Sequence, residues 1–137
     1  MLDHISLRVS YYERSKRFYA AALAPLGYTL AMEAVSGAGF RKEFIPNFWI
    51  KQGAPVAVAA GAESPDLSLG CGGPFVHVAF ASDSRSMVDA FYRAALAAGA
   101  RDNGAPGLRP AYHPNYYGAF VLDPDGYNIE AVCHKAE

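Results

Sequence analysis

The sequence predicts an α+β fold built from two tandem βαβββ modules, and two observations support that prediction. First, His4 and His77 lie 73 residues apart, and each opens an alternating run that is typical of a strand. Second, the helical blocks at residues 18–24 and 91–97 match each other at the same offset. Because two different elements repeat at one spacing, we interpret the chain as two copies of one unit. Their sheets are expected to form a concave, partly open cup.

Each copy should start with a strand and a helix and then add three shorter strands. The first helix should begin at a capping-box pattern, Ser10 with Glu13, and the second at Ser82 or Asp83. Residues 101–117 are rich in Pro, Gly and Tyr, so we interpret them as irregular. The predicted elements are 3–10, 13–26, 28–35, 38–44 and 47–51 in the first copy, and 75–82 and 84–98 in the second.

The second copy should end in a hairpin over residues 118–133. Its turn, at residues 123–126, reads Asp-Pro-Asp-Gly, and each of these residue types favours a tight turn. Along the strand that follows, alternation places Glu130 on the face opposite Ile129. A carboxylate inside the fold requires a partner, because burying it unpaired is too costly.

Length and composition indicate one ordinary globular domain over residues 1–137. The chain has 52% hydrophobic residues and a net charge of −1, without a basic stripe or a long apolar run, so we expect neither nucleic acid nor membrane as a partner. Cys71 and Cys133 cannot form a disulfide framework; both thiols are expected to be buried, and the protein to be cytoplasmic. The expected divisions are module 1 (about 1–52), a linker rich in Gly, Ala and Pro (about 53–74) and module 2 (about 75–137).

Strand alternation places three potential metal ligands on the sheet faces that point away from the helices. His4 and His77 hold equivalent positions in the two copies, and Glu130 lies mid-strand. If these faces line one concave surface, two imidazoles and a carboxylate can hold a divalent ion and leave positions open for substrate. Alternatively, each His is structural or faces solvent, and Glu130 pairs with Arg8 or Arg109.

The sequence also resembles the vicinal oxygen chelate superfamily, which includes glyoxalases, fosfomycin-resistance transferases, extradiol dioxygenases and bleomycin-resistance proteins. The resemblance runs from residues 3–5 through the Phe-Tyr helix to the turn at 123–126 and to Glu130. It implies a glyoxalase-like fold, a homodimer, and metal binding by His4, His77 and Glu130. The ion would be Fe, Mn, Ni, Co or Zn.

The family's fourth ligand position falls within residues 48–50, which offer no ligand. This departure disfavours a lactoylglutathione lyase and leaves the three-ligand pattern of the extradiol dioxygenases and fosfomycin transferases. The transferases carry a basic segment beyond the glutamate that this chain lacks, and the dioxygenases have a tyrosine where this chain has Phe120. An acid/base group would therefore come from His113, Tyr116 or Tyr117.

From these residues we assign a candidate site with three roles. Beside the metal ligands, His113, Tyr116 and Glu130 are the candidate catalytic residues. An aromatic pocket would suit a planar or apolar substrate. The candidate substrate contacts are Arg109, Tyr112, Tyr117, Phe48 and Trp49.

The resulting hypothesis is a metal-dependent enzyme, with dioxygenase-like or lyase/isomerase-like activity, that binds a small oxygenated substrate by bidentate chelation. The alternative is a metal-free protein that binds or sequesters a small molecule, as the bleomycin-resistance branch does. A third possibility is a vestigial cup in a protein that acts through a partner. The modules either pair within a chain or swap between subunits. In a swapped dimer, His4 would come from one subunit and His77 with Glu130 from the other.

Overall fold

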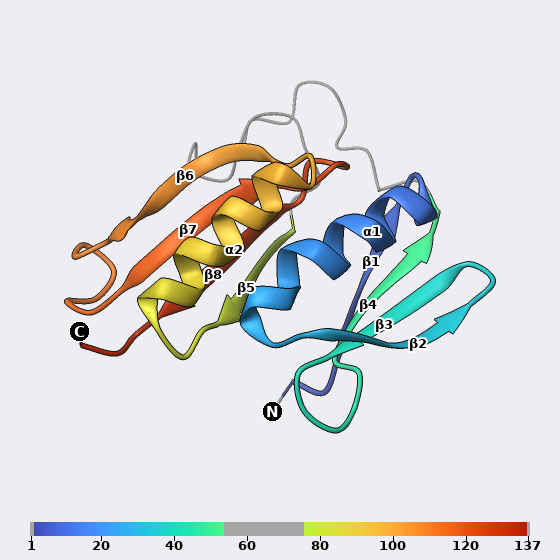
Figure 1. Cartoon of the computed structure of the whole chain (residues 1–137), viewed down its shortest axis with the longest axis horizontal. Helices are drawn as coiled ribbons and strands as arrows, with labels where there is room; N and C mark the ends of the chain where they lie inside the picture. Colours follow the sequence, from blue (N-terminus) through green and yellow to red (C-terminus); the bar gives the residue numbers. More distant parts are fainter. Residues whose placement is uncertain (1, 54–75, 137) are drawn as a thin grey trace.

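A computed structural model describes residues 2–53 and 76–136 of the chain. The first module contains β1 (Ile5–Val9), α1 (Tyr12–Leu23), a short 3-10 helix η1 (Ala24–Leu26), β2 (Thr29–Ala34), β3 (Gly37–Arg41) and β4 (Phe48–Gln52). The second contains β5 (His77–Ala81), α2 (Arg85–Ala97), β6 (Arg101–Leu108), β7 (Tyr117–Leu122) and β8 (Asn128–Cys133) (Figure 1).

The strands form two four-stranded mixed sheets of identical topology. Their orders are β1-β4-β3-β2 and β5-β8-β7-β6. In each sheet the first strand of the module runs parallel to the last, and the other pairs are antiparallel. The predicted α+β architecture of two βαβββ modules is confirmed. Consequently β1 and β5 each lie at the edge of their own sheet.

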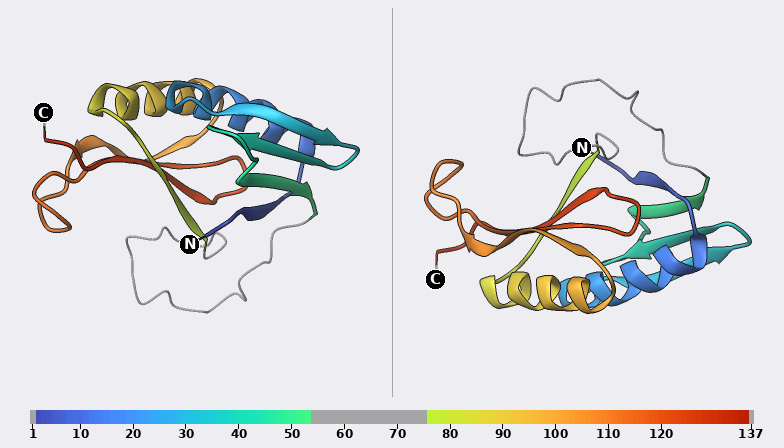
Figure 2. Two further views of the ribbon diagram at one scale, coloured as in Figure 1. Left: turned by 90° about the horizontal axis from the view of Figure 1, so that it is seen from below. Right: turned by 90° about the horizontal axis from the view of Figure 1, so that it is seen from above.

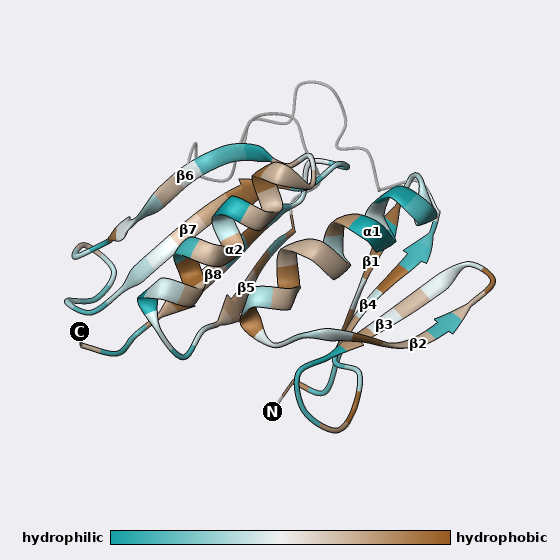
Figure 3. Cartoon of the chain, in the orientation of Figure 1, coloured by the Kyte–Doolittle hydropathy of each residue, from teal (hydrophilic) through white to brown (hydrophobic). Residues whose placement is uncertain are grey.

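The two helices pack side by side along one side of the molecule, and β5 and β8 lie on the other side (Figure 2). Phe18, Ala22 and Leu26 are buried against the sheet in the first module, and Phe91 and Ala95 in the second. Hydrophobic residues concentrate in the inner strands β7 and β8, whereas the outer strand β6 begins with hydrophilic residues (Figure 3). No helix in the described ranges is long and apolar enough to cross a membrane.

Three local predictions need correction. Residues 101–108 form the strand β6 rather than an irregular segment, although pairing with β7 shifts register twice around Gly104. The predicted capping box is absent, because α1 begins after Tyr11 without a side-chain cap. Helix α2 begins after Ser84, whose hydroxyl accepts a hydrogen bond from Met87 N, so its cap is neither Ser82 nor Asp83.

Some of the sequence-based expectations concern residues 54–75. The proposed linker, apart from Gly53, and Cys71 lie outside the described residues. Cys133 is a buried free thiol, as expected.

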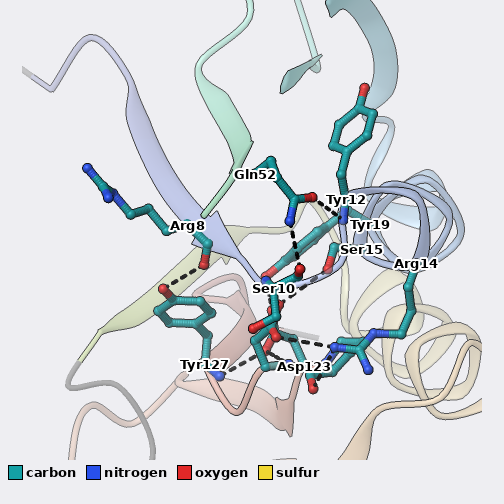
Figure 4. Close-up of polar contacts among 11 residues, drawn as sticks. Arg8, Ser10, Tyr12, Arg14, Ser15, Tyr19, Gln52, Asp123 and Tyr127 are labelled. Atoms are coloured by element: carbon teal, nitrogen blue, oxygen red, sulfur yellow. Dashed lines mark hydrogen bonds and ion pairs between the residues drawn. The ribbon is translucent and has the colours of Figure 1, made fainter. Parts of the chain in front are cut away.

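The start of α1 has partners from both modules. Gln52 Oε1, on β4, accepts a 2.8 Å hydrogen bond from Tyr12 N, the first amide of the helix. Asp125, in the turn between β7 and β8, accepts a hydrogen bond from Ser10 N at 3.1 Å and one from the Ser15 hydroxyl at 3.4 Å, and it pairs with the Arg14 guanidinium at 3.2 Å. A carboxylate at this end of a helix complements the helix dipole. The turn between β7 and β8 therefore holds the start of α1 from across the module boundary (Figure 4).

A buried carboxylate extends the same contact inward. Asp123 is 2% exposed, and its Oδ1 accepts hydrogen bonds from the backbone amides of Asp125 and Tyr127. Its Oδ2 accepts a 2.5 Å hydrogen bond from the hydroxyl of Tyr19 in α1. Tyr127 in turn donates from its hydroxyl to the carbonyl of Arg8, at 2.8 Å (Figure 4). These contacts fix the orientation of one module relative to the other.

Candidate functional site

Glu130 is almost fully buried on β8, with 1% of its surface exposed, and both of its carboxylate oxygens have partners. His77 Nε2, on the neighbouring strand β5, lies 2.9 Å from Oε2. The Tyr116 hydroxyl, just before β7, donates a 2.6 Å hydrogen bond to Oε1. The partner that the sequence requires for Glu130 is therefore an imidazole and a phenol, rather than Arg8 or Arg109.

Close packing keeps this arrangement in place. A Cβ on Gly118 would lie 2.8 Å from Glu130 Oε1 and 3.1 Å from Cε1 of Tyr116, so only glycine leaves room for both side chains. Burial, followed by the hydrogen bond to Glu130, raises the pKa of the Tyr116 hydroxyl well above its ordinary value. Tyr116 therefore remains a protonated donor at neutral pH.

Around these three side chains lies a rim of aromatic and imidazole rings. Phe120 stacks on His77, with ring centroids 6.1 Å apart. The Tyr112 ring, although mostly exposed, contacts the Tyr116 ring edge to face at 5.2 Å. Near it, His134 lies 5.0 Å from Tyr116 and 6.1 Å from His113 by ring centroids, and His113 is exposed. Arg109 lies over Phe120, with its Cζ 5.6 Å from the ring centroid.

Three predicted substrate contacts lie elsewhere in the chain. Tyr117 points to the helix side of its sheet, where its hydroxyl donates to Asp89 on α2 at 2.9 Å. Phe48 is 1% exposed and packs against other core rings. Trp49 lies on the opposite face of β4, over Gly39, and its indole N–H donates to the carbonyl of Pro46. Within one chain, none of the three contributes to the rim around Glu130.

His4 is also separate from Glu130. Its Nδ1 lies 2.6 Å from the Asp3 carboxylate, and its side chain is 55% exposed. Within residues 2–53 and 76–136, no three His, Cys, Asp or Glu side chains form a group that could hold a metal ion. His4 precedes β1 and His77 opens β5, and these two strands are the edge strands of two different sheets.

The comparisons with known proteins agree with this fold. The family model of the Glyoxalase/Bleomycin resistance protein/Dioxygenase superfamily matches residues 1–131. The chain belongs to this superfamily.

Solved structures of the superfamily share its fold over nearly the whole chain. A glyoxalase/bleomycin resistance protein from Albidiferax ferrireducens T118 is 28% identical, with a TM-score of 0.73 over 96% of this chain and 97% of that one. A glyoxalase/bleomycin resistance protein/dioxygenase family enzyme from Burkholderia phytofirmans PsJN is 16% identical (TM-score 0.67, 98% of both chains). The fosfomycin resistance protein FosX from Mesorhizobium loti is 18% identical (TM-score 0.65, 97% and 91%). No curated protein sequence matches this chain.

Members of this glyoxalase superfamily commonly use a divalent metal, and part of the donor set here suits one. The 2.9 Å contact between His77 Nε2 and Glu130 Oε2 is a hydrogen bond that shares one proton between the two side chains. A divalent ion in place of that proton would meet an imidazole nitrogen and a carboxylate oxygen, both ordinary ligands of transition metals. Two of the three expected donors thus fit, and the third has to come from outside this set.

Sequence reasoning missed two residues of this candidate site. Gly118 carries no signal apart from its position in the hairpin, because its role depends on the neighbouring strand. His134 could have been found, since it follows Glu130 by an even number of residues and so continues the same strand face.

Proposed function

We propose that this protein is a metal-dependent enzyme of the superfamily, acting on a small oxygenated substrate at an ion held by His77, Glu130 and the His4 of a second copy. The single observation that carries the proposal is the buried Glu130 carboxylate, whose Oε2 faces His77 and whose Oε1 is held by Tyr116. A buried carboxylate is costly, and a site of this kind is usually retained for function.

The third ligand leads to the proposal of a homodimer. His4 precedes the edge strand β1 and is largely exposed, so it is available to another chain. The open edges of β1 and β5 also leave unpaired backbone groups that a second copy can cover. We therefore propose that modules 1 (about 1–52) and 2 (about 75–137) complete one site between two subunits. A swapped dimer satisfies the ligand set that one chain leaves incomplete.

The chain's own residues would prepare this site in distinct ways. When bound, the metal supplies Lewis-acid polarisation and a template for two substrate oxygens. Tyr116 holds Oε1 of Glu130, which leaves Oε2 directed toward His77. Because its raised pKa keeps the Tyr116 hydroxyl protonated, it serves as a hydrogen-bond donor rather than as the base. His113, exposed at the rim, is the proposed group for proton exchange with solvent.

A complementation experiment tests the proposal. His4→Ala and Glu130→Gln should each bind Mn(II) or Zn(II) much more weakly than the wild type in calorimetric titrations. If the site forms between subunits, refolding the two variants together creates mixed dimers in which one of the two sites is intact. About a quarter of the wild-type sites should then return. Wild-type affinity in both single variants would refute the metal site, and no recovery on mixing would refute the shared site.

A second candidate function is supported by the rim of rings around Tyr116. Tyr112, Tyr116 and Phe120 could bind a planar ligand without metal, as in a sequestering protein of the bleomycin-resistance type. In that case Glu130→Gln would leave ligand affinity nearly unchanged, whereas Phe120→Ala would abolish it. Oxygen consumption with a turned-over substrate would separate dioxygenase-like from lyase- or isomerase-like chemistry.

A further inference from the structure

The guanidinium of Arg109 is a positive charge on the same sheet face as Glu130. Its Cζ lies 5.6 Å from the centre of the Phe120 ring. Its Nη2 donates a 2.8 Å hydrogen bond to the carbonyl of Ala105, and Nη1 a 3.3 Å bond to the carbonyl of Leu108. Both acceptors are neutral carbonyls of β6, and no carboxylate in the described ranges forms an ion pair with Arg109. Its position is therefore fixed, while none of the described carboxylates neutralises its charge.

The glycines of β6 create the space for this guanidinium. A Cβ on Gly107 would lie 2.9 Å from Arg109 Nη1, and a Cβ on Gly104 would lie 3.0 Å from Phe120 Cδ2 and 3.6 Å from Arg109 Nη2. A strand with larger residues here would push the arginine off the ring. Gly104 and Gly107 of β6 thus leave room for the Arg109 guanidinium over the Phe120 ring.

Strand order shows how this cation relates to the proposed metal ligands. Phe120 on β7 is paired with Glu130 on β8 to one side and with Gly104 on β6 to the other. Its ring stacks on His77 of β5 at 6.1 Å, and its plane is tilted by 28°. Since Arg109 packs near Gly104, the Phe120 ring separates the His77–Glu130 pair from the guanidinium. The site therefore has two polar ends with an aromatic ring between them.

We propose that Arg109 is a specificity-determining residue that binds an anionic group of the substrate, with a carboxylate as the group that fits best. A planar guanidinium binds a carboxylate through paired N–H donors, and such charge-assisted bonds are stronger than neutral ones. The assignment of the opposite end of the ligand rests on the proposed function. The substrate class is then a small organic acid whose oxygenated end reaches His77 and Glu130, about one ring width from its carboxylate.

Benzoate and its neutral isostere benzamide test this inference on the full-length protein without added metal. Wild type should bind benzoate at least about tenfold more tightly than benzamide, because only benzoate offers a charged acceptor to Arg109. Arg109→Gln should abolish that preference, and Arg109→Lys should retain part of it, because a lysine keeps the charge without the planar fork. Arg101→Gln, which removes the same charge from the exposed start of β6, should behave as wild type. NMR titration, with the Arg109 Nε–H resonance as a local probe, gives affinity and location together.

The outcomes separate this inference from the proposed function. A benzoate preference that survives in Arg109→Gln, or that is lost equally in Arg101→Gln, overturns the inference, as does no binding of benzoate to wild type at millimolar concentration. Because these titrations contain no metal, failure of the metal site in the complementation experiment leaves their result unaffected. Circular dichroism of each variant confirms that a lost preference is not a lost fold.

Discussion

The Glu130 carboxylate occupies the space that a side chain on Gly118 would need, with Oε1 only 2.8 Å from the position of an added Cβ. The backbone of β7 at Gly118 thus lies directly against the carboxylate of Glu130 on β8. Gly118→Ala should therefore displace the carboxylate and break its hydrogen bond to Tyr116. We expect metal affinity to fall by about tenfold, which is typical when a ligand loses its supporting partner. Calorimetric titration with Zn(II) measures the change.

Gly37→Ala is the matched control for that substitution. A Cβ on Gly37 would lie 3.4 Å from its nearest neighbour, the carbonyl of Ile50, which is tolerable contact on the other sheet. Its metal affinity should equal that of wild type. Equal affinities in all three proteins would show that the Gly118–Glu130 contact does not position the carboxylate.

Glu130→Gln should have opposite effects on metal affinity and on the stability of the metal-free protein. The amide keeps a hydrogen-bond acceptor for Tyr116 but removes the buried charge. We expect metal affinity to fall by at least about tenfold. The melting temperature of the metal-free protein should stay level or rise, because an enclosed carboxylate is partly desolvated without its ion. A variant that keeps full metal content would contradict the enzyme proposal.

Asp125→Ala should destabilise the protein by about 1 kcal/mol, the usual contribution of a hydrogen bond that is lost. Asp125 accepts hydrogen bonds from Ser10 N and the Ser15 hydroxyl at the start of α1. Asp125→Asn is the control, because asparagine keeps an acceptor for these donors and should lose much less stability. Urea denaturation monitored by circular dichroism gives both values. Equal losses would indicate that the charge pair with Arg14, rather than the hydrogen bonds, is what matters.

The buried Asp123 should give the protein a measurable dependence on pH. Burial raises its pKa above the ordinary value of 3.8, despite opposing hydrogen bonds from Tyr19 and from the amides of Tyr127 and Asp125. Between the unfolded and the raised folded pKa, the folded state binds more protons, so the free energy of unfolding falls as pH rises through that window. Above the folded pKa the contribution is constant.

Asp123→Asn tests this expectation, because it keeps an acceptor for the two amides and cannot titrate. Melting temperatures measured from pH near 3.8 upward should show wild type losing stability relative to the variant, and then a constant difference. Parallel curves for the two proteins would mean that Asp123 titrates alike in the folded and unfolded states.

Strand alternation was sufficient to predict the central pair of the site. His77 and Glu130 lie on adjacent parallel strands in which Ala79 is paired with Glu130, so both side chains reach the same face. The repeat of His4 and His77 predicted the two modules correctly. It did not predict the strand order that places β1 and β5 each at the edge of its own sheet, since that order is not encoded in either strand alone.

The errors have a common physical origin in contacts that are remote in sequence. Tyr116 and Tyr117 are adjacent, and only the start of β7 at Tyr117 decides that one faces Glu130 and the other faces α2. The Gly and Pro content of residues 101–108 led to the prediction of an irregular segment, but these residues form a strand whose glycines make room for Arg109. The partners of the start of α1 could not be found nearby, because they are Gln52 and Asp125.

The contact between Ser10 and Asp125 has a consequence for synthesis of the chain on the ribosome. The two residues are 115 positions apart in sequence. Chains fold from the N-terminus as they are made, usually one unit at a time. Here the carboxylate that pairs with the start of α1 is absent until the turn between β7 and β8 has been made, so a chain that terminates before Asp125 exposes this helix end to the quality-control machinery.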